Sequence, residues 1–500
     1  MQEVSRLPTE CTELVLEEKD AADWIYRGEG AANLVLAYKG SSPSFVGKVI
    51  RLQKAPKNIS QSMNGTSVFS VQECLLWKDT NDLLSSTSKE NVGQLYSLHI
   101  MSPLLGSEHV DPGDLDLRKM VGRSRMVDGL YMLENKASLA VIESTSQSSE
   151  IQMRILVSKE FLESVEKNVL CQRPAWRVDA ANINILCDSA LLVSDHSVFP
   201  HGILKEEPCI SVEIKPKCGF LPSSRFIAEG NFIKRSITRF RMHQVLKHHE
   251  GEISQISEYD PLDLFSGSSE RIHKAIKALF TTPQNNFRIF LNSSLIFGGL
   301  GGGRDSTDFV MGESFEDKME GIIRADYGLR TASFLQLVAE AIFRSGVLDR
   351  LLEAQKLDLL DIEGAIHAYY NIVSQPCVAC RDLAVRELSH SLHSISLEES
   401  LKIVRDYLVA ATAKDCSFMI SFRPREDGDP SLSHRTVCLE PINQNFDYKV
   451  NFIDLDLKPL KKMLYYYELD QKIVSCYNQM NKEHGISDTK SMERSEAAGI

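Results

Sequence analysis

The sequence has no excess of positive charge. Its 56 Lys and Arg are outnumbered by 68 Asp and Glu, which gives a formal net charge of −12. A nonspecific nucleic-acid binder needs a basic surface that releases counterions from the phosphate backbone, so the composition argues against that class. Any polyanion that the chain binds must therefore meet a local basic pocket.

Long apolar runs are also missing. No run reaches the roughly 18 apolar residues of a membrane-spanning helix, and the first residues, MQEVSRLPTECTELVLEEKD, show no secretory signal. The 11 cysteines are odd in number and scattered. We therefore expect reduced thiols, a location in the cytoplasm or nucleus, and metal binding as the exception to look for. We also expect a monomer with neither a membrane nor a nucleic-acid partner.

What is present is a globular composition with a distinctive central segment. Hydrophobic residues make up 43% of the 500 residues and charged residues 25%, enough for one large domain or two to three ordinary ones. In Ser211-Val-Glu-Ile-Lys-Pro-Lys-Cys-Gly219, the alternation of apolar and charged residues predicts a strand that Pro216 ends. Two lysines at a strand end favour an anion site, although an edge strand protected by lysines fits the pattern equally well.

The longer segment SVEIKPKCGFLPSSRF resembles the signature of plant inositol-pentakisphosphate 2-kinases, and the similarity runs from about residue 17 to 467. The resemblance implies an α+β, two-lobed kinase-like fold with a nucleotide cleft between the lobes. We expect a flexible leader at 1–16 and a first lobe at 17–200 with a mixed or antiparallel sheet. A larger lobe at 201–481 and a disordered tail at 482–500 follow. Residues 114–153 fit no part of the family pattern, and we interpret them as an extra loop.

A glycine turn lies near the N-terminus, between two strand-like runs in WIYRGEGAANLVLAY (24–38). Glycine lets backbone amides approach phosphate closely, although most such pairs of glycines form ordinary hairpins. The next strand-like run places either Lys48 or Arg51 toward a nucleotide. In the family this loop covers ATP, so the resemblance assigns Gly30, Ala31, Ala32, Asn33 and Arg51 to the nucleotide. Ala31 stands where the relatives have glycine.

The roles expected for several further residues rest mainly on the resemblance to the family. Arg177, after Trp176, is a candidate phosphate clamp because a guanidinium can bind two phosphate oxygens, but it also fits an ordinary surface arginine. The nucleotide set implied by the family continues with Ser194, Asp195, His196, Glu213, Asn285, Asn286, Arg288, Met419 and Asp454. The two asparagines also suit a tight turn in which they only satisfy backbone groups.

Residues 231–247 are predicted to form one helix with an apolar face and a cationic remainder that includes Lys234 and Lys247. Such a charged face is usually solvated. The resemblance nevertheless assigns Lys247 to the substrate, together with Lys217.

A zinc site is predicted from His367, Cys377, Cys380 and His393, spaced as His-x9-Cys-x2-Cys-x12-His. Two thiolates and two imidazoles are a set that tetrahedral zinc prefers, and four protein ligands make the site structural. His390 competes with His393 from spacing alone, and the resemblance favours His393. Two unrelated cysteines are the alternative.

Two acids near the C-terminus complete the pattern. Asp415 comes just before an apolar strand and Asp454 directly after another. One carboxylate can deprotonate an attacking hydroxyl while the other holds Mg²⁺, as phosphoryl transfer requires, although acids at strand ends are also common turn residues. Lys458, Lys462 and Tyr466, four apart, are predicted on one helical face toward a polyanion. Lysine at 462 replaces the arginine typical of the family.

Together these features predict an enzyme that transfers phosphate from ATP to the 2-hydroxyl of inositol pentakisphosphate, giving the hexakisphosphate. Asp415 would be the base and Lys215 a second catalytic residue. Arg177, Lys217, Lys247, Lys458, Lys462 and Tyr466 would bind substrate, with ATP, Mg²⁺ and a structural Zn²⁺ as cofactors. The alternatives are a catalytically silent inositol-phosphate sensor and a zinc-bearing interaction protein.

Overall fold

The computed structural model describes residues 14–30, 32–57, 68–86, 89–111, 155–199, 208–299, 313–380, 392–425 and 435–497. Ala31, the competing ligand His390 and the extra segment 114–153 lie outside the described residues. The chain divides into two compact units. Unit 1 comprises Met1–Ser62 and Pro112–Asp195, and unit 2 comprises Met63–Asp111 and His196–Ile500.

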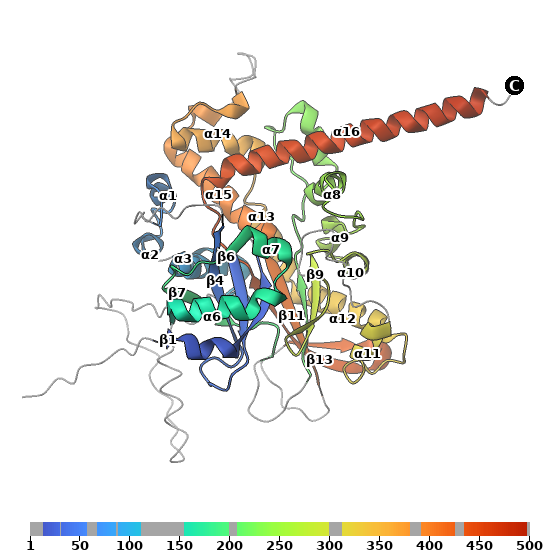
Figure 1. Cartoon of the computed structure of the whole chain (residues 1–500). Helices are drawn as coiled ribbons and strands as arrows, with labels where there is room; N and C mark the ends of the chain where they lie inside the picture. The colour runs from blue at the N-terminus through green and yellow to red at the C-terminus, as the bar shows by residue number, and fades with distance from the viewer. Residues whose placement is uncertain are drawn as a thin grey trace, which may run out of the picture. The chain divides into compact units, whose positions relative to one another are not determined.

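Unit 1 is built on a mixed sheet with the strand order β1-β5-β7-β4-β3-β2, in which β1 and β5 are parallel and the other pairs antiparallel (Figure 1). A further strand, β6, pairs with β4. The strands are β1 (Val15–Leu16), β2 (Trp24–Glu29), β3 (Asn33–Tyr38), β4 (Lys48–Pro56), β5 (Ile155–Val157), β6 (Ala181–Ile183) and β7 (Ser189–Ser194). The helices are η1 (Glu18–Asp23), α6 (Lys159–Val169), η3 (Leu170–Gln172) and α7 (Ala175–Ala180).

Alternation along the unit 1 strands decides which side chains reach the core. Leu34, Leu36, Ile50 and Leu52 are buried in one cluster with the apolar face of α6. Because successive side chains point to opposite faces, Asn33 and Arg51 lie on the other face of the sheet.

Unit 2 contains an antiparallel sheet of order β10-β9-β8-β11-β13-β12 among long helices (Figure 1). The strands are β8 (Ile210–Ile214), β9 (Phe287–Leu291), β10 (Ser294–Phe297), β11 (Ser417–Pro424), β12 (Arg435–Leu439) and β13 (Gln444–Ile453). The α-helices are α1 (Val71–Leu76), α2 (Asn81–Ser85), α3 (Lys89–Tyr96), α4 (Ser102–Leu105), α8 (Arg239–His249), α9 (Pro261–Leu264), α10 (Ser269–Thr281), α11 (Glu313–Lys318), α12 (Arg330–Ser345), α13 (Val347–Gln355), α14 (Asp361–Val373), α15 (Leu397–Asp415) and α16 (Lys462–Ala497). Shorter elements are η2 (Ser97–Met101), η4 (Glu229–Arg235), η5 (Val378–Cys380), η7 (Leu392–Ser394) and η8 (Glu440–Ile442).

The α+β fold class is confirmed, with two sheets in the described part of the chain, but the division of the chain differs from the expected one. Residues 63–111, placed by the sequence in the first lobe, belong to unit 2. The Tyr96 hydroxyl donates to Thr412 Oγ1 at 3.2 Å, and the His109 carbonyl accepts from the Phe452 amide at 2.7 Å. These contacts span more than 300 residues of sequence, which local patterns do not reveal.

The C-terminal helix is longer than expected. Helix α16 continues through residues 482–497, which we predicted to be disordered (Figure 1). Its first half packs through Ile473 and Val474 on α8. Once a helix is nucleated, each further residue adds one hydrogen bond, and residues 482–497 contain no proline that would stop it. Among the described residues, no helix combines the length and the apolar character needed to cross a bilayer.

Candidate active site

The two predicted acids lie at the ends of neighbouring strands in unit 2, as the sequence indicated. Strands β11 and β13 are antiparallel, with Ser417 opposite Ile453. Asp415, the last residue of α15, precedes β11, and Asp454 follows β13. The backbone of Asp454 has φ +61°, a left-handed conformation that is costly for a residue other than glycine. Such strain is concentrated at functional sites.

Asp415 is held between two ammonium groups. Its Oδ1 lies 3.2 Å from Lys217 Nζ and its Oδ2 lies 3.0 Å from Lys458 Nζ. Burial acts to raise the pKa of Asp415, but Lys217, Lys458 and Lys215 outweigh it and hold the pKa well below its ordinary value. The carboxylate is therefore ionised at neutral pH and half-exposed, at 52% of its side-chain surface.

Lys217 has a pKa below the ordinary value of a lysine. Burial, opposed by Asp415 and aided by Lys215 and Lys247, lowers the pKa of Lys217 to about 8. By contrast, Asp415 raises the pKa of Lys458 against the effect of burial. Lys217 also has a left-handed backbone, with φ +62°. The predicted concentration of lysines around Asp415 is thus present within unit 2.

The helical row predicted from Lys458 to Tyr466 is only partly correct. Helix α16 begins at Lys462, so Lys462 and Tyr466 share a helical face while Lys458 lies in the preceding segment. Lys458 is followed by Pro459, and a residue before proline is disfavoured in helical conformation. Lys458 nevertheless reaches Asp415, and Lys458 and Asp415 both influence the pKa of Tyr466, which burial raises.

Two residues near the Asp415 site, Arg239 and His243, received no role in the sequence analysis. Arg239 and His243 precede Lys247 on α8 at intervals of four residues, so the three share one side of the helix. Burial, aided by Arg239, Lys247 and Lys217, lowers the pKa of His243 to about 3. The imidazole is therefore neutral. The i, i+4 spacing was visible in the sequence, but the sequence analysis gave no role to Arg239 or His243.

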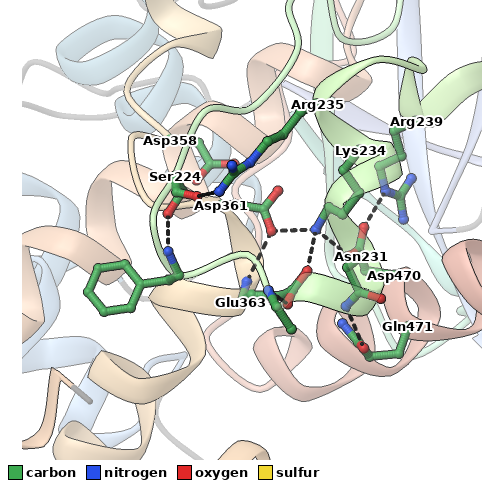
Figure 2. Close-up of polar contacts among 12 residues, drawn as sticks. Ser224, Asn231, Lys234, Arg235, Arg239, Asp358, Asp361, Glu363, Asp470 and Gln471 are labelled. Carbon is green, nitrogen blue, oxygen red and sulfur yellow. Dashed lines mark hydrogen bonds and ion pairs between the residues drawn. The ribbon is translucent and has the colours of Figure 1, made fainter. Parts of the chain in front are cut away.

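That expected helix over 231–247 is two elements, η4 and α8, separated because Thr238 caps α8 by accepting from the Arg241 amide. Lys234, in η4, is buried rather than solvated, at 3% exposure. Its ammonium lies 2.5 Å from Asp361, 3.0 Å from Glu363 and 2.6 Å from Asp470. Figure 2 shows the three carboxylates around this ammonium.

This buried Lys234 cluster links elements that lie far apart in the sequence. Asp470, on α16, also accepts from Arg239 Nε at 3.3 Å (Figure 2), and Glu363, on α14, accepts from the Ala228 amide at 2.9 Å. The three carboxylates raise the pKa of Lys234 despite its burial, so the lysine stays charged. The cluster therefore joins η4, α8, α14 and α16 and holds Arg239 by its Nε.

The residues assigned to the nucleotide within unit 2 form a row across the sheet. Met419, Glu213 and Arg288 occupy directly paired positions on β11, β8 and β9 and therefore share one face. Arg288 Nη1 lies 3.2 Å from Glu213 Oε2, and Arg288 Nε donates to the Gly299 carbonyl at 3.0 Å. The His196 carbonyl accepts a hydrogen bond from Ser421 Oγ, two residues after Met419 on β11.

The asparagines have different surroundings. Asn286 is buried, and its side-chain Nδ2 donates to the Lys215 backbone carbonyl at 3.0 Å. The Lys215 backbone amide in turn donates to the Asn286 backbone carbonyl at 2.9 Å. Asn286 therefore fixes the end of β8, which is the turn-satisfying role left open by the sequence. The adjacent Asn285 is exposed.

In unit 1, the glycine turn lies between β2 and β3 and is closed by a hydrogen bond from the Gly30 amide to the Asn33 carbonyl at 2.8 Å. The Ala32 carbonyl accepts from the Lys54 amide at 2.8 Å. Of the two cations left open by the sequence, Arg51 shares the face of Asn33, whereas Lys48 Nζ donates to Ser194 Oγ at 3.3 Å. Arg51 is therefore better placed beside the turn.

Unit 1 also contains a buried ion cluster near Arg177, whose charge acts on Lys54 of that cluster. Glu29, which precedes the turn, accepts from Lys54 Nζ at 2.5 Å and from Arg173 Nε at 2.9 Å. Arg177 follows on α7, stacked over Trp176 at 4.0 Å. Asp195, the last residue of unit 1, lies 2.7 Å from Arg27 Nη2. The chain passes to unit 2 between Asp195 and His196.

The four predicted zinc ligands converge in unit 2. His367 Nδ1 lies 3.2 Å from Cys380 Sγ and 3.6 Å from Cys377 Sγ, and His393 Nε2 lies 3.3 Å from Cys380 Sγ. A tetrahedral zinc with ordinary Zn–S and Zn–N bonds separates such N and S atoms by about 3.5 Å. The group therefore has the geometry and the donor atoms for a four-coordinate metal.

Asn371 is a supporting residue that the sequence did not reveal. Its Oδ1 lies 2.8 Å from His393 Nδ1, while its amide group donates to the Leu392 carbonyl at 2.7 Å and Ser400 Oγ at 3.1 Å. Because Asn371 Oδ1 is an acceptor, it favours the tautomer with the proton on Nδ1 and leaves Nε2 free to bind a metal.

Comparison with known proteins identifies the family of the chain. The family model for inositol-pentakisphosphate 2-kinase matches residues 26–472. The chain is 53% identical to the inositol-pentakisphosphate 2-kinase of Arabidopsis thaliana, over 95% of this chain and 98% of the relative. It is 50% identical to the enzyme of Oryza sativa subsp. indica, over 95% and 97%, and 27% identical to that of Danio rerio, over 92% and 94%. The chain therefore belongs to the inositol-pentakisphosphate 2-kinase family.

Proposed function

We propose that this chain transfers the γ-phosphoryl group of ATP to the 2-hydroxyl of inositol pentakisphosphate and releases inositol hexakisphosphate. Family membership supports the reaction class. The observation that carries the assignment of the site is Asp415, an ionised, half-exposed carboxylate between Lys217 and Lys458. A base beside several cations is what an anionic acceptor with one free hydroxyl requires.

Asp415 orients the 2-hydroxyl and accepts its proton as the phosphoryl group is transferred. Lys215, at the end of β8, stabilises the charge on that group. Because phosphoryl transfer needs little covalent help, positioning and electrostatics supply most of the rate enhancement.

The phosphates of the acceptor are held by cations that the fold brings near Asp415. Lys217, Lys458 and Lys247 act with Arg239 and the neutral His243. The proposed set is completed by Lys462 and Tyr466 of α16 and by Arg177 of unit 1. Lysine at 462 supplies charge without the two-pronged geometry of arginine.

ATP is assigned to the glycine turn and to the row of residues that crosses the unit 2 sheet. The proposed contacts are Gly30, Ala31, Ala32, Asn33, Arg51, Ser194, Asp195, His196, Glu213, Asn285, Asn286, Arg288 and Met419. Asp454 would hold Mg²⁺, since a carboxylate oxygen is the ligand that this ion prefers, and the ion would neutralise charge on the nucleotide phosphates. We further propose a monomer in the cytoplasm or nucleus.

A pH dependence follows from Lys217. Lys217 carries its charge below its pKa of about 8 and loses it above. We therefore expect kcat/KM for inositol pentakisphosphate to fall as the pH rises through 8, because this ratio reports the free enzyme. The Lys217→Arg variant keeps its charge, so its alkaline limb should move to higher pH. An identical limb in both proteins would contradict the assignment.

We also propose that His367, Cys377, Cys380 and His393 bind a structural zinc ion. Elemental analysis of the purified chain should find roughly one zinc per molecule, since four ligands close a single site. The Cys380→Ser variant should lose the metal and unfold at a lower temperature, because metal binding is coupled to folding. Cys438→Ser, which alters a thiol on β12 outside the group, is the control. Equal metal contents in the two variants would contradict the site.

The proposed function is tested by incubating the chain with ATP, Mg²⁺ and the pentakisphosphate that lacks the 2-phosphate, and by separating products by ion chromatography. Formation of hexakisphosphate with one ADP per product supports it. Binding without turnover, measured calorimetrically, would instead support a silent inositol-phosphate sensor.

A further inference from the structure

The loop that carries Lys217 is unusual because it holds a lysine in a left-handed conformation, φ +62°. A conformation of this kind is strained for a residue other than glycine and persists only where surrounding contacts impose it. The Tyr259 hydroxyl donates to the Pro216 carbonyl at 2.8 Å on one side of Lys217. A Cβ at Gly219 would lie 2.3 Å from the Phe265 ring, so the loop passes tightly against its neighbours.

Gln355, the last residue of α13, supplies the other contacts. Its Oε1 accepts from the Gly219 amide at 2.8 Å, and its Nε2 donates to the Lys217 carbonyl at 2.9 Å. The same Nε2 donates to the Ala413 carbonyl at 3.1 Å, two residues before Asp415. The side chain is fully buried, at 0% exposure.

One amide group therefore joins the backbone beside the lysine to the backbone beside the base. Its oxygen and both of its N–H groups are used, so no equally short side chain can reproduce the three bonds. The side chains of the same two residues are also in contact, because Lys217 Nζ lies 3.2 Å from Asp415 Oδ1.

Resting on the proposed function, we propose that Gln355 is a positioning residue, which sets the Lys217 ammonium and the Asp415 carboxylate at their working separation. Gln355 does not reach the reacting atoms itself. Its loss should release the loop from its left-handed conformation and let Lys217 move relative to Asp415. Misplacement by about 1 Å can cost about 10²-fold in rate.

The test compares two isosteric changes, Gln355→Met and Gln444→Met. Gln444 is also buried in unit 2, where its Oε1 accepts from the Arg324 amide at 2.9 Å and its Nε2 donates to the Ile322 carbonyl at 2.8 Å. Both variants lose buried hydrogen bonds and should lose stability. Only Gln355→Met should lower kcat by about 10²-fold, with KM for ATP unchanged.

A conservative variant adds a signature that a purely structural role lacks. In Gln355→Glu the ionised carboxylate keeps the acceptor for Gly219 but cannot donate to Lys217 or Ala413. Only its protonated form restores a donor, so kcat relative to the parent should rise as the pH falls. A parent-like pH profile for this variant would overturn the inference, as would equal kcat losses in Gln355→Met and Gln444→Met.

A readout independent of turnover separates this inference from the proposed function. Amine-reactive labelling of Lys217, followed by peptide mass spectrometry across pH, reports its environment, which includes Asp415, Lys215, Lys247 and His243. The midpoint should lie near 8 in the parent and in Gln444→Met, and move toward that of an ordinary lysine in Gln355→Met. An unmoved midpoint overturns the role of Gln355, whereas a parent without turnover but with the expected shift overturns only the kinase assignment.

Discussion

Replacing Asp415 with asparagine is expected to lower kcat by about 10²–10⁴-fold, the range contributed by a positioned general base. The amide keeps the size of the carboxylate but cannot take a proton from the 2-hydroxyl. Lys458, which now binds Asp415, would be left with its charge free for substrate phosphates, whereas the pKa of Lys217, which Asp415 raises, would fall further. Because these two effects oppose each other, affinity for inositol pentakisphosphate should change little, as measured by calorimetry beside single-turnover kinetics.

The matched control is Asp406→Asn. Asp406 lies on the same helix, α15, and also contacts a lysine, with its Oδ2 2.6 Å from Lys402 Nζ. That variant should keep the parent kcat. An Asp415→Asn variant that turns over at more than about a tenth of the parent rate would fall outside the range for a general base and contradict the role of Asp415.

Lys234→Met is expected to lower the free energy of unfolding by about 3–5 kcal/mol, the usual cost of removing one partner from a buried ion cluster. Methionine fills similar space but leaves three buried carboxylates without their ammonium (Figure 2). Burial already raises the pKa of Asp361 to about 6 with Lys234 present, and the loss of the lysine removes the charge that opposes this. Equilibrium urea unfolding of the full chain measures the change.

Lys402→Met provides the comparison, because Lys402 forms an exposed i, i+4 pair with Asp406 whose loss should cost at most about 0.5 kcal/mol. Adding Asp361→Asn to the Lys234 variant should recover part of the stability, since fewer unpaired charges stay buried. Similar small losses in Lys234→Met and Lys402→Met would show that the cluster is not a source of stability.

Local patterns in the sequence predicted several of the groupings that the fold brings together. The alternation in SVEIKPK predicted β8, and the apolar runs beside Asp415 and Asp454 predicted two strand ends that the sheet brings together. Likewise the spacing of His367, Cys377, Cys380 and His393 predicted a group whose ligand atoms lie within 4.8 Å of one another. In each case, short-range chemistry and the tertiary structure agree.

The errors arose where distant residues override a local preference. A lysine on an amphipathic segment is usually solvated, yet Lys234 meets Asp361 and Asp470, which lie 127 and 236 residues away in sequence. Gln355 acts on Gly219 across 136 residues, so no spacing rule could have identified it. The start of α16 was the exception, since Pro459 is a local signal against a helix that includes Lys458.

The position of the transferred phosphate tests the central claim most directly. The chain would be given ATP, Mg²⁺ and, in separate reactions, two inositol pentakisphosphates, one with its 2-hydroxyl free and one with an equatorial hydroxyl free. We predict hexakisphosphate from the first isomer only, because in the proposed site Asp415 and its surrounding cations would present one hydroxyl to the nucleotide. Equal phosphorylation of both isomers, or of the second alone, would contradict a site built for the 2-hydroxyl.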